Sequence, residues 1–501
     1  MYKRISEQLM KTLTQLAFHN TYSTLPATFG TRVSPQPLDD PFLVSVNPLV
    51  CNMLELDPSD AQTPYFIDLF SGNDEHPSFD PIAMKYTGHQ FGQYNPDLGD
   101  GRGLLLGEVL TSSGNKWDIH LKGSGLTPYS RQGDGRAVLR SSIREYLASA
   151  AMAGLGIKTT HALAVLSSCT PVYRERVECG ATLIRVAESH LRFGHFEYLF
   201  YTHQHAELKQ LADYLIQHHF PELNNEQNDE LRYAAMFSKI VTLTAKMVAD
   251  WQAVGFAHGV MNTDNMSMLG LTFDYGPYGF LDDYNPGFIC NHSDYSGRYA
   301  FNQQPSIALW NLSALGYALT PIISKEHIDA GLSRYQVDLQ REYSHNMRSK
   351  LGLVKRLKED TDLFNQLFDL LSGQGADYTL FFRAISNIGK EELLTSTNLF
   401  VPLFSRIEPV EQWLQAYKSR LDAEEQNDEA RLTLMNQHNP KFILRNYLAQ
   451  QAIDAAEQGD YTMIEKLLTV LATPFDEHAE LDDLAQRPPE WGKHLEISCS
   501  S

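Results

Sequence analysis

Two short stretches in the middle of the chain carry side chains that can hold a metal and move a proton. The first runs from His258 to Asn265 and includes Asp264, and the second begins at Asp274, nine residues after Asn265. Amide and carboxylate oxygens are the ligands that hard divalent cations such as Mg²⁺ prefer. A carboxylate placed beside such ligands can act as a general base. The two stretches therefore predict a reaction centre that uses a metal.

The order of these residues is typical of the catalytic loop of kinase-like enzymes. In that loop an Asn about five residues after a catalytic Asp binds the metal, and the Asp of a later Asp-Phe-Gly motif holds the metal-bound phosphates. On this pattern Asn265 and Asp274 are the metal ligands, and Val260 occupies the position of the catalytic Asp. Asp264 is then the carboxylate left to act as the base. This combination indicates a metal nucleotide and a reaction other than ordinary phosphoryl transfer to a hydroxyl.

A strand and a helix upstream are expected to position an ion pair beside the nucleotide. Residues 116–122 alternate in polarity as a half-buried strand does, and Lys122 ends that run. A lysine in this place either reaches a phosphate or only makes an edge strand soluble. Glu145 lies 23 residues further on, in a predicted helix that begins at Arg136. Kinase-like folds place there the Glu that pairs with the strand Lys, which favours the first interpretation.

Glycines and buried arginines provide further candidates for phosphate binding. Gly99, Gly101 and Gly103 precede an apolar run and indicate a tight turn between strands. Such a turn can approach a phosphate, and a hairpin without a ligand explains the pattern equally well. Arg185 lies within an apolar strand, where a charge is costly unless it has an anionic partner. That partner is either a carboxylate in a buried salt bridge or a phosphate that Arg192 also approaches.

The remaining pattern predicts mainly helices. The row formed by Arg136, Arg140 and Arg144 is expected to be a solvated positive face of the first helix. Apolar periodicity predicts further helices over residues 205–218, 228–255, 310–319, 325–353, 360–371, 391–400, 440–456 and 461–471. The second of these leads directly into the loop at His258, and residues 280–299 resemble an activation segment.

Size, charge and cysteine content limit the class of protein. With 501 residues, 43% of them apolar, the chain can form two or three domains around a large core. Its 61 acidic and 41 basic side chains give a net charge of −20, which argues against nucleic acid as a partner. None of the 5 cysteines forms a Cys-x-x-Cys pair, so no zinc site or disulfide framework is predicted. Neither a leader sequence nor a membrane-spanning apolar run is found, which predicts a cytoplasmic protein without a membrane anchor.

Several motifs in combination resemble a known family. They are Tyr86-x-Gly-His-Gln-Phe-Gly92, Leu98-Gly-Asp-Gly-Arg102, Leu121-Lys-Gly-Ser-Gly-x-Thr-Pro-Tyr-Ser-Arg131, the stretch from His258 to Asn265 and the Cys-Ser-Ser terminus. From about residue 80 to its end the chain resembles the selenoprotein O (SelO/YdiU) family of kinase-like protein adenylyltransferases. The resemblance implies an α+β, bilobal protein-kinase-like fold. Its N-lobe would contain both helices and a β-sheet, and its C-lobe would be largely helical. The chain would extend beyond this core at the N-terminus and at the C-terminus.

The resemblance also implies a reaction and its residues. ATP would bind inverted relative to ordinary kinases, AMP would pass to Ser, Thr or Tyr hydroxyls of proteins, and pyrophosphate would leave. UMP transfer from UTP is a variant of this reaction. Mg²⁺ or Mn²⁺ would be held by Asn265 and Asp274, Asp264 would be the catalytic base, and Lys122 would pair with Glu145. The residues carried over as nucleotide-binding are Gly99, Gly101, Arg102, Lys122, Asp134, Gly135, Arg185, Arg192 and Asp274.

One implication concerns the redox state of the chain. Some family members end in Cys-x-x-selenocysteine, whereas this chain carries Cys499 third from its end and Glu496 in place of the partner Cys. A local redox pair in the tail is therefore absent. The resemblance leaves open a disulfide between Cys499 and Cys290 in the activation-like segment, with two unrelated thiols as the alternative.

Two other functions stay open at the level of sequence. A kinase would transfer the γ-phosphoryl group of ATP, and Val260 argues against it. A nucleotide-sensing scaffold would need no complete metal site, whereas this chain keeps Lys122, Glu145, Asn265 and Asp274. We expect a monomer with four parts. These are an N-terminal wrapping segment (1–80), an N-lobe (81–200), a C-lobe with the catalytic loop (201–420), and a C-terminal helical extension with a cysteine-containing tail (421–501).

Overall fold

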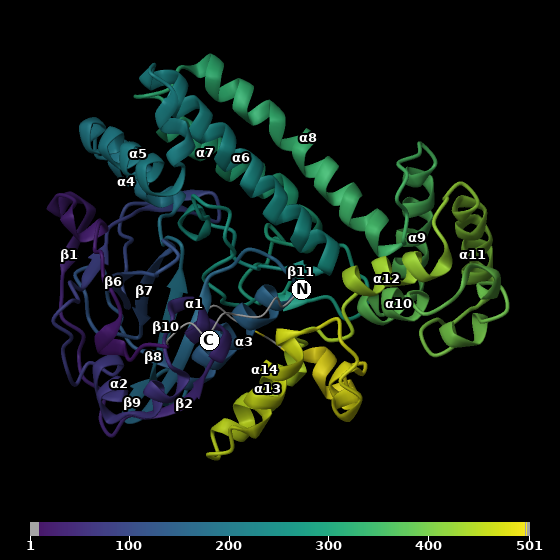
Figure 1. The fold of residues 1–501 in the computed structure, drawn as a ribbon, viewed down its shortest axis with the longest axis horizontal. Coiled ribbons are helices and arrows are strands. Elements are labelled where there is room, and N and C mark those ends of the chain that lie inside the picture. Colours follow the sequence, from purple (N-terminus) through teal and green to yellow (C-terminus); the bar gives the residue numbers. More distant parts are fainter. Residues whose placement is uncertain (1–9, 496, 498–501) are drawn as a thin grey trace.

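The computed structural model describes residues 10–495 and 497, with a sheet-rich N-terminal part and a helical C-terminal part (Figure 1). This is the mixed, bilobal kinase-like architecture expected from the sequence. All strands of the main sheet pair antiparallel. In spatial order they are β1 (Gly30–Arg32), β3 (Ile82–Met84), β6 (Gly103–Leu110), β7 (Lys116–Lys122), β10 (Val177–Ala187), β9 (His161–Tyr173) and β2 (Phe42–Val46), with β8 (Ala137–Val138) paired to β10 beside this path.

The first 80 residues build both edges of the main sheet. β1 lies at one edge and β2 at the other, and helices α1 (Pro48–Leu54) and α2 (Pro64–Phe70) follow β2. Each helix begins at a polar cap, because the side chain of Asn47 accepts from Leu49 N–H and that of Thr63 from Phe66 N–H. An edge strand that is paired with its own chain is closed to other chains on that side. The segment therefore completes the sheet at both edges.

Helix α3 (Leu139–Gly154) packs on the sheet and begins three residues later than predicted, because strand β8 occupies Ala137–Val138. It therefore carries Arg140 and Arg144 but not Arg136, and the predicted solvation of this row is wrong. Arg144 is buried, with its guanidinium 4.5 Å above the ring of Tyr278 and a hydrogen bond to the Tyr278 carbonyl. Arg140 pairs with Glu178 at 3.1 Å. The residues that follow Asp274 pack against this side of α3, which helical periodicity alone does not reveal. The row is therefore largely an internal contact surface.

The longest helices lie in the C-terminal part, and one of them leads into the loop at His258. α6 (Asp229–Val254) and α8 (Lys325–Lys350) run side by side in the C-terminal part (Figure 1). Gly255, at a φ of 74°, ends α6 in the left-handed conformation that glycine adopts readily. The chain then passes directly into β11 (Phe256–Ala257), which pairs with β12 (Gly279–Phe280). The residues between these paired strands form the loop that contains Asp264 and Asp274.

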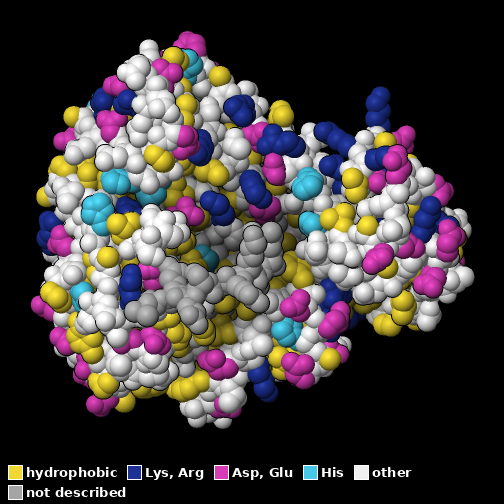
Figure 2. Space-filling model, in the orientation of Figure 1, with side chains coloured by type: hydrophobic (Ala, Val, Ile, Leu, Met, Phe, Trp, Pro, Cys, Tyr) yellow, Lys and Arg dark blue, Asp and Glu magenta, His cyan; other side chains and the backbone are white. Residues whose placement is uncertain are grey.

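The other helices cover the C-lobe and extend it. None of the described helices is long and apolar enough to cross a membrane. Helices α9 to α12 project from the body of the protein (Figures 1 and 2). Two short strands, β4 (Gly88–Gln90) and β5 (Gln93–Asn95), pair with each other apart from the main sheet. The remaining helices are α4 (Phe193–Tyr201), α5 (His205–His219), α7 (Gln304–Ala318), α9 (Asp360–Gln374), α10 (Tyr378–Ile385), α11 (Glu408–Leu421), α12 (Asp428–His438), α13 (Asn446–Ala456) and α14 (Thr462–Ala472).

The predicted helix over residues 391–400 is wrong. The chain there forms only short 3₁₀ turns, at Lys390–Glu392 and Thr397–Phe400. A Thr-Ser-Thr-Asn run at residues 395–398 leads into the second turn, and such side chains compete with the helix for backbone hydrogen bonds. Pro402 follows at once and cannot continue a helix.

A buried arginine joins the C-terminal helices to the segment after the catalytic loop. Arg445 directly precedes α13 and is 1% exposed. Its guanidinium pairs with Asp282 and lies 3.0 Å from a carboxylate oxygen of Asp377, the residue that caps α10. Removing one partner of such a pair leaves buried charge uncompensated. This contact therefore stabilises the relative placement of three segments.

We predict that Arg445→Met lowers the free energy of unfolding by about 3–5 kcal/mol, because the buried carboxylate of Asp377 and the half-buried one of Asp282 lose their partner. Urea unfolding measures the change. Arg487→Met is the matched control, since its partner Asp283 is 44% exposed at the side chain and the pair is near the surface. A loss of under about 1 kcal/mol is expected there. Equal losses of unfolding free energy in the two variants would contradict the stabilising role given to the Arg445 contacts.

Candidate active site

A cleft of about 560 Å³ lies between the main sheet and the catalytic loop. Residues from both lobes form its walls. All the residues predicted to bind nucleotide or metal or to act as base line it, namely Gly99, Gly101, Arg102, Lys122, Asp134, Gly135, Arg185, Arg192, Asp264, Asn265 and Asp274. The fold thus brings together residues that lie up to 175 positions apart in the sequence, from Gly99 to Asp274.

The register of the sheet explains how two cations reach the same wall. Arg185 in β10 lies opposite His120 in β7, and His120 and Lys122 share a face because side chains alternate along a strand. Lys122 Nζ lies 2.5 Å from Glu145 Oε2 on helix α3. Arg185 pairs with the other oxygen of Glu145 and, through Nη2 at 2.7 Å, with Asp274. One buried carboxylate therefore joins β7, β10 and α3.

The charges in this cluster shift one another. Burial lowers the pKa of Lys122 to about 8. The negative charge of Glu145 raises this pKa, whereas the positive charges of Arg102 and Arg185 lower it further. Burial alone would raise the pKa of Glu145, but Arg185 and Lys122 outweigh it and bring that pKa to about 2. Glu145 is thus ionised at neutral pH. Its charge is the condition under which the two cations can be buried together.

Asp274 is held between two arginines in a costly backbone conformation. Its φ is +60°, in the left-handed region that residues other than glycine rarely adopt. One carboxylate oxygen pairs with Arg185 and the other with Arg192. Burial would raise the pKa of Asp274, but Arg192 and Arg185 hold it far below its usual value. The carboxylate is therefore charged and fixed in direction, as a metal ligand must be.

Asp264 has the environment of a general base. It is 7% exposed, and its Oδ1 has no hydrogen-bond partner among the described residues. Gln90 donates to its other oxygen at 3.3 Å, and Arg192 donates to its backbone carbonyl at 2.9 Å. Burial raises the pKa of Asp264 to about 7; Arg192 opposes this shift and Asp274 adds to it. A base with a pKa near neutral is well matched to proton transfer at physiological pH.

The donor atoms fit a hard divalent cation that also contacts the substrate. Asn265 donates through Nδ2 to the carbonyl of Val260 at 3.1 Å, so its amide oxygen points away from that carbonyl. Together with Asp274 it offers oxygen ligands to one cleft. Over residues 10–495 and 497, no group of three or more His, Cys, Asp or Glu side chains could hold a metal by itself. Further oxygens, such as those of phosphates, are needed to complete the coordination.

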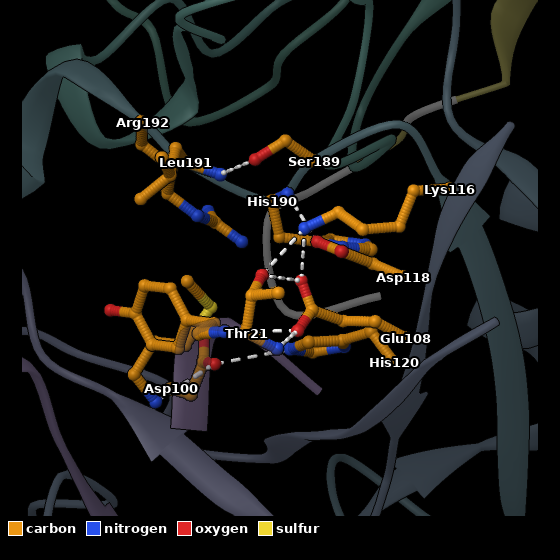
Figure 3. A network of polar contacts seen from close by, with 12 residues as sticks. Thr21, Asp100, Glu108, Lys116, Asp118, His120, Ser189, His190, Leu191 and Arg192 are labelled. Carbon is orange, nitrogen blue, oxygen red and sulfur yellow. Dashed lines mark hydrogen bonds and ion pairs between the residues drawn. The ribbon is translucent and has the colours of Figure 1, made fainter. Parts of the chain in front are cut away.

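The glycine turn is supported from behind by a polar network that the sequence did not reveal (Figure 3). Asp100, between two of the turn glycines, lies 3.1 Å from Nε2 of His120, whose ring stacks on that of His190 at 4.6 Å. Burial lowers the pKa of His190 to about 4, so this ring is neutral at physiological pH. Glu108 accepts hydrogen bonds from Lys116 and from the backbone of Thr21. The network ties the N-terminal segment to the strands that carry the turn.

Two glycines that line the cleft are required by packing as well as by any ligand: Gly99 in the turn, and Gly135 in the loop before α3. A Cβ at Gly135 would lie 2.0 Å from the carbonyl oxygen of Gly125, at a φ of +71°. At Gly99 it would meet the ring of Tyr129 at 2.6 Å. Asp134 pairs with Arg174 at 2.7 Å. These contacts hold the turn and the loop before α3 in place at the side of the cleft.

Some residues of the site had no role assigned from the sequence, and one predicted residue lies outside the described part of the chain. Gln90 and Tyr86 belong to a motif quoted above without a role, although Arg192 lies 4.7 Å from the ring centroid of Tyr86. The local sequence gives no signal for such contacts across the fold. Cys290 is buried in the segment after β12. Cys499 lies outside the described residues, so the disulfide stays a prediction.

The fold and the cleft define a kinase-like enzyme, and comparisons with known proteins give its family. Residues 12–472 match the family described as "Protein adenylyltransferase SelO". Proteins named "Protein nucleotidyltransferase YdiU" are similar over almost the whole chain. The one from Photobacterium profundum is 68% identical over 98% of this chain and 100% of its own. Those from Vibrio parahaemolyticus and Aliivibrio salmonicida are 55% and 54% identical, each over 97% of this chain and 99% of its own.

The chain therefore belongs to the SelO family of protein adenylyltransferases. It is a nucleotidyltransferase. This activity implies ATP as substrate and a divalent metal as cofactor. The family expected from the sequence motifs is confirmed.

We predict that Asp264→Asn stabilises the protein free of nucleotide and metal, and more so at pH 8 than at pH 5. An acid whose folded pKa is raised to about 7 costs stability as pH rises from its unfolded pKa through 7, because burial opposes ionisation. The variant removes this cost, which should make its stabilisation about 2–3 kcal/mol larger at pH 8. Urea unfolding at both pH values measures the difference. A stabilisation that does not change with pH would contradict the raised pKa.

Proposed function

We propose that this enzyme transfers AMP from ATP to Ser, Thr or Tyr hydroxyls of proteins, with ATP bound in the opposite direction to that in ordinary kinases. Mg²⁺ or Mn²⁺ would be held by Asn265 and Asp274, where it would neutralise and orient the phosphates. UMP transfer from UTP would use the same groups. The observation that carries the proposal is the position of Asp264 in a loop that has Val260 where a kinase has its base.

The distribution of charge supports an inverted triphosphate. Lys122, Arg185 and Arg192 are each 5% exposed or less, and they share only the carboxylates Glu145 and Asp274. Three cations against two carboxylates leave one excess positive charge among these described residues. Buried charges need partners, and the β- and γ-phosphates would provide them. Holding that end of ATP in the cluster would leave the α-phosphate for the acceptor.

Asp264 would then remove the proton of the acceptor. In the proposed step the hydroxyl oxygen forms a bond with the α-phosphorus while its proton passes to the carboxylate of Asp264. The bond from the α-phosphorus to the bridging oxygen breaks, and pyrophosphate leaves with the electron pair. Lys122 and the two arginines would stabilise the charge that develops on it. Gln90, which donates to Oδ2, would keep the carboxylate aimed at the acceptor.

We predict that label from α-labelled ATP, and not from γ-labelled ATP, appears on proteins when the enzyme is incubated with a protein extract and Mg²⁺ or Mn²⁺. Asp264→Ala should reduce this transfer by about 10²–10⁴-fold, the usual contribution of a general base. Gel autoradiography with both labels measures the outcome. ATP binding by the variant, measured by calorimetry, is the control for folding.

Three results would contradict the proposal. Label from the γ position alone would identify a kinase with an unusual loop. A variant that keeps full transfer would remove Asp264 from the base role. Transfer that is absent in the wild-type protein despite ATP binding, also under reducing conditions, would favour a nucleotide-sensing scaffold.

A further inference from the structure

A second groove, of about 550 Å³, borders the active-site cleft. Its walls come from residues 287–303 of the segment after β12 and from Ile307 in α7. Phe91, in the turn between β4 and β5, lines both the groove and the cleft. The preceding residue, Gln90, donates to Asp264. The groove therefore begins where the proposed acceptor hydroxyl would have to lie.

Phe91 is held at this border in an unfavourable state. Its φ is +50°, and its side chain is 42% exposed. The backbone N–H donates to the hydroxyl of Tyr299 at 2.9 Å, and the two rings pack with centroids 5.0 Å apart. A left-handed conformation at a residue other than glycine costs about 1–3 kcal/mol and is typical of functional sites. An exposed ring kept in this way contributes little to the core, which points to contact with another molecule.

The groove combines apolar walls with a cation that lacks an acidic partner. Ile289 is 43% exposed, and Ala300 and Ile307 line the floor. Arg298 lies 5.0 Å from the ring centroid of Trp310, and no Asp or Glu in the described part of the chain forms an ion pair with it. Its Nε is buried without a hydrogen-bond partner among those residues. An anionic group with an apolar neighbour would satisfy both features.

We propose that this groove binds the segment of the acceptor protein next to the modified hydroxyl and selects an acidic and an apolar side chain in that segment. The proposal rests on the proposed transfer to proteins and adds its sequence preference. A chain whose hydroxyl reaches Asp264 passes over Phe91, because Phe91 forms the border between cleft and groove. Its flanking residues then lie on Ile289 and beside Arg298. These residues act in specificity and take no part in the chemical step.

Charge exchange tests the role of Arg298. Sites that carry AMP after incubation with extract are mapped by mass spectrometry, and each is made as two peptides, with Glu or with Lys at the flanking positions. We expect the wild-type protein to prefer the Glu peptides in kcat/KM by roughly two- to fivefold, the scale of an exposed ion pair. Arg298→Glu should reverse this preference while KM for ATP is unchanged. Equal loss on both peptides, or no change, overturns the proposal.

A matched pair of variants tests the apolar wall. Ile289→Ser should raise KM for the acceptor peptide severalfold and leave KM for ATP unchanged. Leu394→Ser, which removes a similarly exposed side chain (39%) from the projecting helical part, should change neither. If Ile289→Ser behaves as the control, the groove takes another occupant and the proposal fails. Absence of AMP transfer to any protein would instead refute the proposed function, so the two failures are distinguishable.

Discussion

The carboxylate of Asp274, clamped between Arg185 and Arg192, is the interaction on which the architecture of this protein depends. Arg185 belongs to β10 of the sheet, Arg192 caps helix α4, and Asp274 ends the catalytic loop. Because Arg185 also pairs with Glu145, the clamp continues into α3 and to Lys122. Both lobes are thus fixed against one set of charges, and the cleft that they enclose has a defined shape.

Such a cluster is a poor way to gain stability. Burying several charges costs free energy that their mutual attraction barely returns, and apolar replacements of similar volume are often as stable. Asp274 adds a left-handed backbone, and Asp264 adds a carboxyl whose ionisation is opposed by burial. Strain and unpaired charge of this kind gather at functional sites, where stability is exchanged for activity. Phosphate oxygens and a metal would supply the missing partners, so binding would relieve what folding leaves unfavourable.

Much of the fold could be predicted from local pattern. β7 has the predicted bounds, and α6 ends within one residue of its prediction, since alternation, helical periodicity and a terminal glycine are all local signals. The helix over residues 391–400 failed because Thr and Ser side chains compete with backbone bonds. The prediction that Arg144 is solvated failed for a different reason. Its partner Tyr278 is remote in sequence, and no helical pattern shows what covers a helix face.

The sequence by itself determined the types and the spacing of the reactive groups: an amide and a carboxylate that can bind a metal, and a loop with Val260 in place of the usual base. These are matters of chemistry and short-range order, and with the surrounding motifs they sufficed to identify the family. Only the tertiary structure decided the partners. It gave Arg185 two carboxylates, left Oδ1 of Asp264 without a hydrogen bond among the described residues, and placed Phe91 at the border of a groove. Each of these three features depends on contacts between segments that are distant in the sequence. No local pattern encodes such contacts, because they form only when the whole core packs together.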